Sequence, residues 1–375
     1  MIINTQNTSF KGYDAIPLRA FYMQGIKKRG EAKIFSEMKN IAKKEGLDIF
    51  LNQDCEKISS ELKEKVPHVV RISLWGQDNK AFIKNKDGKI ILWNGNESPM
   101  IQEDLGELSD FKIDIKNYFP RGGNYYLGYK PNGEKWLIIN SMSVTSEEGF
   151  EKYFDMPTKK HLCEKFDVKP ENICMLTDIA NDIDEVVRPI GYPYILVNDY
   201  KLSLKNLEKM KRSGIKNPET YYEPWNYINK MIQEESTDVV FNCDEVCNKL
   251  KKFGFKPIRI GGRYNYDINY MNALAFQNNR GGISYITNST KGSYPELEYL
   301  EKLFEKDLRG KVPKISDTYF VSGGKRTERE KNSNSYSALY GRGLKDRNVI
   351  MDILANRQGG IHCMTAEVPR FDKIV

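Results

Sequence analysis

The strongest constraint on the fold is a pattern that recurs along the chain. Two short apolar stretches joined by a turn are followed by a stretch with helical spacing and then by another apolar stretch. In the first unit the helical spacing stops at Gly46, a residue that commonly ends helices. The pattern predicts a mixed α/β protein of hairpin, helix and strand units. They are expected at 16–51, 69–93, 124–166, 183–253 and 273–306, with a strand at 69–74, a turn at 85–88, and helices at 31–45, near 147–166 and near 243–253.

The order of predicted strands and helices recurs, but the amino-acid sequence does not, because no motif repeats at a fixed period. The hairpins recur at even intervals, so we expect the 375 residues to form a single domain, 1–375. Residues 322–348 differ from the rest, since they are rich in Gly, Ser, Asn and charge. That composition is typical of an inserted mobile loop, either a surface insertion or a lid or partner-binding loop.

Charge and hydropathy limit the function. The chain has 58 basic and 51 acidic residues, a formal net charge of +7, and the two signs are interspersed. We therefore expect a solvated surface and no nucleic-acid partner. No run approaches the roughly 18 apolar residues of a membrane span, and the start lacks a basic and then apolar leader. We expect a cytoplasmic protein, with export by a route that needs no standard signal as the alternative.

The six cysteines are scattered, and only Cys243 and Cys247 lie close together, four apart on a predicted helix without a nearby histidine cluster. This spacing favours reduced thiols over a zinc site, so we expect no metal and no cofactor. Cys363 differs in its context, Gly-Gly-Ile-His-Cys-Met-Thr at 359–365. A glycine pair permits unusual backbone angles, so Cys363 could be a positioned nucleophile, or else a small core residue.

Carboxylates and an aromatic ring supply a second group of candidates. Trp75 and Asp78 follow a predicted strand, where they could hold a planar cation, although Asp78 could equally cap a turn. A strand is predicted at 183–187. Asp184 lies in it and Asp182 just before it, and because the two are two residues apart their side chains should point to one face. Two such carboxylates repel each other unless a cation or a proton lies between them.

A fourth element, Arg-Gly-Gly-Asn at 121–124, could line a pocket with Gly123 and Asn124 or simply form a turn. Taken in order, Trp-x-x-Asp, Gly-Gly-Asn, Asp-x-Asp-Glu and Gly-Gly-Ile-His-Cys-x-Thr resemble the guanidino-group-modifying superfamily with the pentein fold. The chain looks most like its agmatine deiminases and the catalytic domain of peptidyl-arginine deiminases. The resemblance spans about 74–369, and 16–51 fits the opening unit.

The resemblance implies a five-bladed α/β propeller of ββαβ units around a polar pocket. It implies a hydrolase, a deiminase of agmatine, arginine or peptidyl-arginine, that works through a covalent thiouronium adduct. Cys363 matches the attacking cysteine, and Asp78 and Asp184 match the two carboxylates that grip the guanidinium. Trp75 belongs with Gly123 and Asn124 in the implied substrate pocket. The implied partner is a small guanidine or an arginine-bearing protein, and self-association is left open.

One position departs from the family pattern, which has His-x-Asp where this chain has Asp182-Ile-Asp184. Asp182 could take over the proton transfers of that histidine, with a pKa raised by burial and by Asp184. Another histidine could replace it, although His362 should face away from Cys363 on a predicted strand, and the other two are more typical of surface or core. In the third alternative the chain binds an arginine-like ligand or partner without turnover, or transfers an amidino group.

Overall fold

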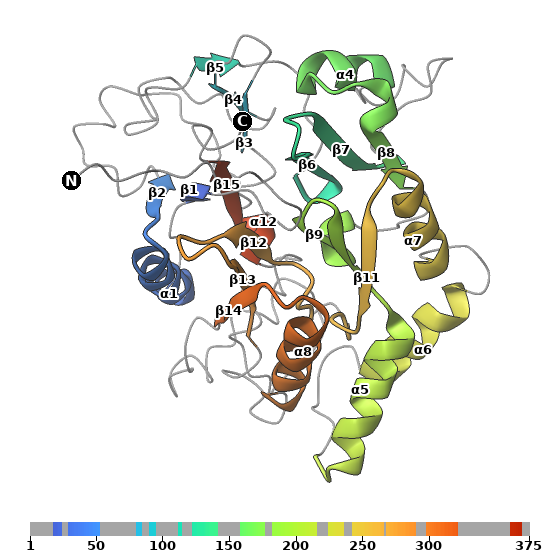
Figure 1. Ribbon diagram of the computed structural model, residues 1–375. Coiled ribbons are helices and arrows are strands. Elements are labelled where there is room, and N and C mark those ends of the chain that lie inside the picture. The colour runs from blue at the N-terminus through green and yellow to red at the C-terminus, as the bar shows by residue number, and fades with distance from the viewer. Residues whose placement is uncertain are drawn as a thin grey trace, which may run out of the picture.

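The structure is a computed structural model, and it describes residues 18–24, 29–52, 80–84, 90–94, 112–114, 122–141, 158–176, 182–215, 224–235, 242–265, 268–289, 298–321 and 361–369 (Figure 1). Its helices and strands confirm the mixed α/β class. In chain order they are β1 (Leu18–Gln24), α1 (Arg29–Glu45), β2 (Asp48–Asn52), β3 (Lys80–Lys84), β4 (Ile90–Asn94), β5 (Lys112–Asp114), η2 (Gly122–Asn124), β6 (Tyr125–Tyr129), β7 (Lys135–Asn140), α4 (Lys159–Phe166), η4 (Pro170–Asn172), β8 (Ile173–Leu176), η5 (Ile183–Glu185), β9 (Val187–Gly191), β10 (Tyr194–Asn198), α5 (Tyr200–Arg212), α6 (Pro224–Glu235), α7 (Cys243–Lys252), β11 (Lys256–Ile260), β12 (Leu274–Gln277), β13 (Ile283–Asn288), α8 (Glu298–Lys311), β14 (Ile315–Val321), α12 (Ile361–Met364) and β15 (Thr365–Pro369).

The described strands form five sheets of three strands, and all five have the same topology. The middle strand of each pairs antiparallel with one neighbour and parallel with the other. A parallel pair needs a crossover connection, and α1, α4, α5 to α7 and α8 lie in four of these connections. In the first sheet the antiparallel neighbour of β1 is β15, so segments near the two ends of the chain share one sheet.

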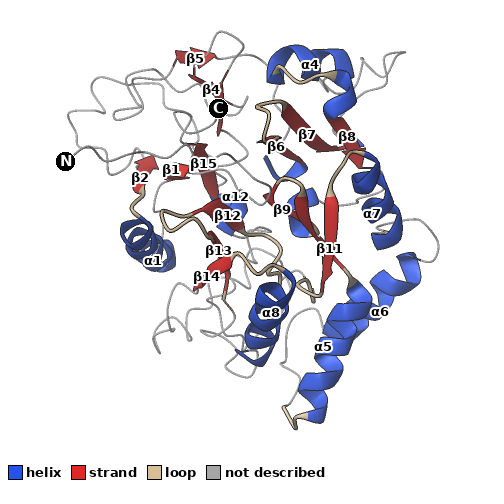
Figure 2. Cartoon of the chain, in the orientation of Figure 1, coloured by secondary structure: helices blue, strands red, loops and turns tan. Residues whose placement is uncertain are grey.

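The described helices α1, α4, α5, α7 and α8 lie on the outside of the molecule, with the sheets towards its middle (Figure 2). Helix α1 shows why, since Ile34, Met38 and Ile41 recur at helical spacing and are buried. They belong to one apolar cluster with side chains of β12 and β13. The helix ends before Gly46, which has a left-handed backbone (φ 67°).

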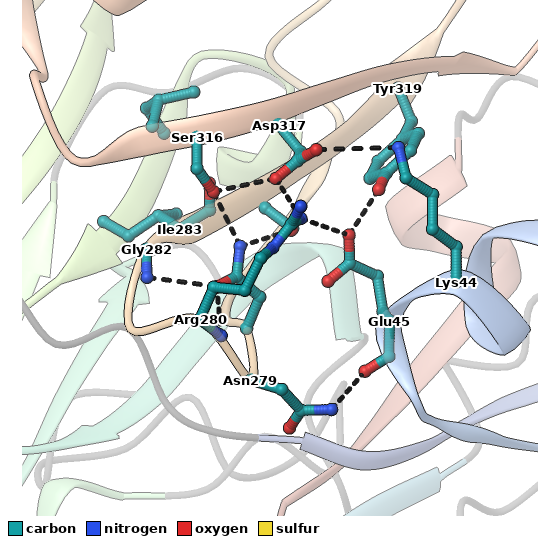
Figure 3. Close-up of polar contacts among 12 residues, drawn as sticks. Lys44, Glu45, Asn279, Arg280, Gly282, Ile283, Ser316, Asp317 and Tyr319 are labelled. Atoms are coloured by element: carbon teal, nitrogen blue, oxygen red, sulfur yellow. Dashed lines mark hydrogen bonds and ion pairs between the residues drawn. The ribbon is translucent and has the colours of Figure 1, made fainter.

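A polar cluster fixes the C-terminal end of α1 to the β12–β13 turn and to β14 (Figure 3). The buried carboxylate of Glu45 accepts a hydrogen bond from the Tyr319 hydroxyl and lies 3.6 Å from the Arg280 guanidinium. Asn279 Nδ2 donates to the backbone carbonyl of Glu45 over 2.8 Å, which satisfies a carbonyl that the helix leaves open. Arg280 also pairs with Asp317. These contacts join the opening unit to the fifth unit.

Two local predictions are wrong. The predicted strand 183–187 is a 3-10 turn, η5, over Ile183–Glu185, and the strand β9 begins only at Val187. His362 was predicted on a strand, but 361–364 form the short helix α12, and β15 follows it. The predicted stretches 69–74 and 322–348, the turn 85–88 and the first part of the helix predicted near 147–166 lie outside the described residues.

Candidate functional site

Three segments that are distant in the sequence meet at one place: η2, η5 and α12. Segment η2 lies against both η5 and α12. Asp184 of η5 and His362 of α12 are hydrogen bonded, with 2.9 Å between Asp184 Oδ2 and His362 Nδ1, although they are 178 residues apart in the chain. Both side chains are buried, with 0% of Asp184 and 1% of His362 exposed. The contact therefore places an acid from the fourth unit beside the helical turn that contains Cys363.

Two asparagines hold that helical turn. The first backbone N–H groups of a helix have no partner within the helix, and here Ile361 N–H donates to Asn288 Oδ1 over 3.0 Å. In the same way, His362 N–H donates to Asn272 Oδ1 over 3.0 Å. Asn272 also donates from Nδ2 to Asp184 Oδ2 over 2.8 Å. Asn272 thus binds the backbone of His362 and its carboxylate partner at the same time, which fixes the backbone that leads into Cys363.

Asp182 lies at the same junction, against Gly123 of η2. A methyl group added at Gly123 would come within 2.8 Å of three side-chain atoms of Asp182, so only glycine fits there without a shift. The next residue, Asn124, accepts a hydrogen bond from Asn140 Nδ2 over 3.3 Å. The 121–124 motif therefore does more than form a turn, because it packs directly against the acidic segment.

A buried arginine sets the electrostatics around His362. Arg188 of β9 forms an ion pair with Glu367 of β15 at 2.5 Å, and its guanidinium lies 5.3 Å from the centre of the Tyr126 ring. The Tyr126 ring in turn lies 5.3 Å from the His362 ring. Burial and then the charge of Arg188 hold the pKa of His362 well below its ordinary value, so the imidazole is neutral at pH 7.

A second ion pair, with a buried arginine and a partly buried glutamate, lies beside Asp182. Glu185 pairs with Arg263, whose guanidinium also lies 5.7 Å from the centre of the Tyr227 ring. Burial raises the pKa of Glu185, Arg263 opposes this shift, and the charge of Asp182 adds to it. Three acidic residues, Asp182, Asp184 and Glu185, therefore lie on one short segment of the junction.

The structure brings together four of the predicted site residues, Gly123, Asn124, Asp182 and Asp184, although Asp182 and Asp184 lie on a turn and not on one face of a strand. Cys363 lies in α12, but its side chain is outside the described residues. The predicted Trp75 and Asp78 also lie outside them. These two residues and the sulfur of Cys363 stay predictions.

Sequence reasoning missed other members of the junction. Asn272 and Asn288 flank a predicted hairpin, where an asparagine is ordinarily a turn residue, so nothing marked them. Arg188 had a usable signal, because an arginine inside an apolar strand needs a buried partner. In the described part of the chain, no three His, Cys, Asp or Glu side chains are grouped to hold a metal ion. No described helix is long and apolar enough to cross a membrane.

Comparisons with known proteins establish the fold. An agmatine deiminase of C. jejuni superposes with a TM-score of 0.52 at 12% sequence identity, over 96% of this chain and 95% of that chain. The two proteins share a fold. An arginine dihydrolase, ArgZ, from the ornithine-ammonia cycle in cyanobacteria gives a TM-score of 0.42 at 11% identity, over 95% of this chain and 39% of that one. No family model and no curated protein matches the sequence.

Proposed function

We propose that the chain is a hydrolase of guanidinium groups that uses Cys363 as its nucleophile and Asp184 as a carboxylate that binds the cation. The observation that carries the proposal is the 2.9 Å contact between Asp184 and His362, because it joins the acidic segment to the helical turn that contains Cys363. The fold shared with an agmatine deiminase supports it, as do the four sequence elements. In this proposal the five sheets are the blades of a propeller around the site.

The chemistry explains why such residues are needed. A guanidinium carbon is a poor electrophile because its positive charge is spread over three nitrogens, so it must be held still beside a thiolate. Carboxylates hold it through forked, charge-assisted hydrogen bonds, and we assign this role to Asp184 and to Asp78 on the opposite side. The face of Trp75 would stack on the planar cation.

The proposed reaction has two steps. The Cys363 sulfur bonds to the guanidine carbon, and one carbon–nitrogen bond breaks as that nitrogen takes a proton and leaves as ammonia. Water then attacks the thiouronium adduct, the carbon–sulfur bond breaks, and the ureido product leaves the free thiol. Asp182 is the group we assign to proton exchange, since it stands at the position of the family histidine beside η2.

The direct test is labelling of the cysteines with a haloacetamidine, a guanidinium-shaped electrophile. Cys363 should react much faster than Cys163, which is half-buried on α4 and serves as the control. Cys363→Ala should abolish release of ammonia from agmatine, whereas Cys163→Ala should retain it. Mass spectrometry should show a product about one mass unit heavier than its guanidine, the replacement of NH by O. Equal labelling of the two cysteines, or turnover by Cys363→Ala, would refute the proposal.

The presence of Asp182 in place of a histidine favours a second candidate, a protein that binds an arginine-like group without hydrolysis or transfers its amidino group. Binding without turnover predicts that agmatine raises the melting temperature of the wild-type chain while no ammonia appears. Transfer predicts an amidine-sized mass gain on an acceptor amine. Asp182→His should raise hydrolysis if Asp182 is a weakened proton donor, and unchanged activity would exclude that role.

A further inference from the structure

Both the side chain and the backbone of His362 make specific polar contacts, which a residue that only fills the core would not need. Its ring is buried, its Nδ1 contacts Asp184 Oδ2 at 2.9 Å, and its backbone N–H donates to Asn272 Oδ1 over 3.0 Å. Asn272 closes the set by donating to the same carboxylate oxygen over 2.8 Å. Two contacts therefore converge on Asp184 Oδ2, one from Asn272 Nδ2 and one with His362 Nδ1, and together they restrain the carboxylate.

The tautomer of His362 follows from its surroundings. Among the described residues, Asp184 and Arg188 place charged groups near the ring, and Arg188 is itself paired with Glu367. A neutral imidazole carries one N–H, and an ionised carboxylate can only accept. With Asp184 ionised, the hydrogen lies on Nδ1 and Nε2 is left as an acceptor, and this is the tautomer that the inference below requires.

We propose that His362 is a positioning residue: through Nδ1–H it orients the Asp184 carboxylate for a guanidinium ligand, and it takes no part in proton exchange with the substrate. This inference rests on the proposed function and assigns a specific task within it. A neutral donor suits that task better than a cation. A histidinium would compensate the charge of Asp184 and compete with the ligand, whereas neutral imidazole orients the carboxylate and leaves its charge for the guanidinium.

The same arrangement distinguishes substrate from product. A guanidinium carries a positive charge and a ureido group does not, so an oriented carboxylate binds the first more strongly than the second. His362 would therefore help the site to release its product, although it touches neither ligand in this role.

Three substitutions of His362 distinguish the role of Nδ1 from that of Nε2. In His362→Asn the side-chain amide can place its N–H near the position of Nδ1, with nothing at Nε2. In His362→Gln the amide reaches the position of Nε2 and loses the contact at Nδ1. His362→Leu keeps neither and tests packing alone. Each is made in the chain with and without Cys363→Ala, so that binding and turnover are measured separately.

We expect the Asn variant to bind agmatine within a few-fold of wild type in calorimetry, and to keep kcat. The Gln and Leu variants should bind roughly tenfold to a hundredfold more weakly, the range for loss of a hydrogen bond to a charged group. A rise in KM with an unchanged kcat should accompany the loss. The inference is overturned if Gln retains activity that Asn loses, because Nε2 would then be the functional atom. It is also overturned if all three variants bind like wild type.

A measurement without ligand keeps this inference separate from the proposed function. The chain has three histidines, so ¹⁵N-histidine NMR can assign their tautomers by comparison with His362→Asn. We expect one histidine that stays neutral with its hydrogen on Nδ1 between about pH 5.5 and 8. An Nε2–H tautomer would refute the positioning role even if agmatine binds. Failure of agmatine to bind, with the Nδ1–H tautomer present, would instead refute the proposed function.

Discussion

Asn272→Asp is the sharpest test of the junction, because it changes one NH₂ group to an oxygen and leaves the shape unchanged. Asn272 Nδ2 lies 2.8 Å from Asp184 Oδ2, while its Oδ1 accepts from His362 N–H. The variant keeps the acceptor for His362 N–H. It replaces the donor with a carboxylate oxygen that faces Asp184 at the same distance.

The expected loss can be worked out from that distance. Two charges 2.8 Å apart repel each other by about 6 kcal/mol at an effective dielectric constant of about 20. The chain can instead place a proton between the two carboxyl groups. For an acid with a pKa near 4, this costs about 4 kcal/mol at pH 7 and about 1.4 kcal/mol at pH 5. The smaller cost applies, so Asn272→Asp should lower the free energy of unfolding by about 4 kcal/mol at pH 7.

The sign of the pH effect is equally definite. The folded variant binds a proton that its unfolded chain releases above pH 4, so its stability relative to wild type must rise as the pH falls. Urea unfolding of the variant and of the wild type at pH 7 and pH 5 measures both the loss of stability and its change with pH. At each pH the wild-type free energy of unfolding is subtracted from that of the variant.

Asn278→Asp is the matched control. Asn278 is also buried, but its Nδ2 faces the hydroxyl groups of Ser284 and Ser316, at 3.1 and 2.7 Å, and a hydroxyl can turn to donate to a carboxylate. Asn278→Asp should therefore lower the free energy of unfolding at pH 7 by less than Asn272→Asp does. The reasoning would be refuted if Asn272→Asp is as stable as this control at pH 7, or if its loss fails to shrink at pH 5.

Three further predictions concern the same junction. Gly123→Ala should lower the melting temperature and slow haloacetamidine labelling, since its methyl group would lie 2.8 Å from the Asp182 side chain. The wild-type free energy of unfolding should fall as the pH drops below about 6.5, by up to about 1.4 kcal/mol per pH unit, because the unfolded chain protonates His362 and the folded chain does not; His362→Asn should remove this slope in urea titrations. Glu367→Gln should cost about 1.5–3 kcal/mol in the same assay, because it removes a charged partner from the buried Arg188, while 28% of the Glu367 side chain is exposed and the amide oxygen can still accept a hydrogen bond.

The repeating units could be predicted because periodicity survives in a single sequence. The predicted helix 31–45 corresponds to α1 (Arg29–Glu45), and the predicted stretch 243–253 corresponds to α7 (Cys243–Lys252). In both, apolar residues recur over several turns. The third strand of some units was missed for the opposite reason: β8 has four residues, and β11 contains Pro257, so neither shows a clear alternation.

The two wrong predictions have a common physical cause. Residues 183–185 and 361–364 are too short for their periodicity to distinguish a strand from a helical turn. Helix α12 is set by tertiary contacts, since its first N–H groups are bound by Asn288 and Asn272 from the fifth unit. Because His362 was assigned to a strand, its contact with Asp184 could not be predicted either.

In the proposed mechanism, Asp182 takes the place of the histidine of the family that the chain resembles, and this assignment changes what activates the thiol. A histidinium at that position would stabilise a thiolate, whereas Asp182, Asp184 and Glu185 surround the junction with carboxyl groups. Neutral His362 adds no positive charge, and Arg188 is already paired with Glu367. Among the described residues we identify no other cation for this role, and we predict that the bound guanidinium supplies the positive charge that favours the thiolate. Cys363 should for this reason be slow towards a neutral haloacetamide and fast towards a haloacetamidine, and the ratio of the two rates measures how far the substrate activates its own nucleophile.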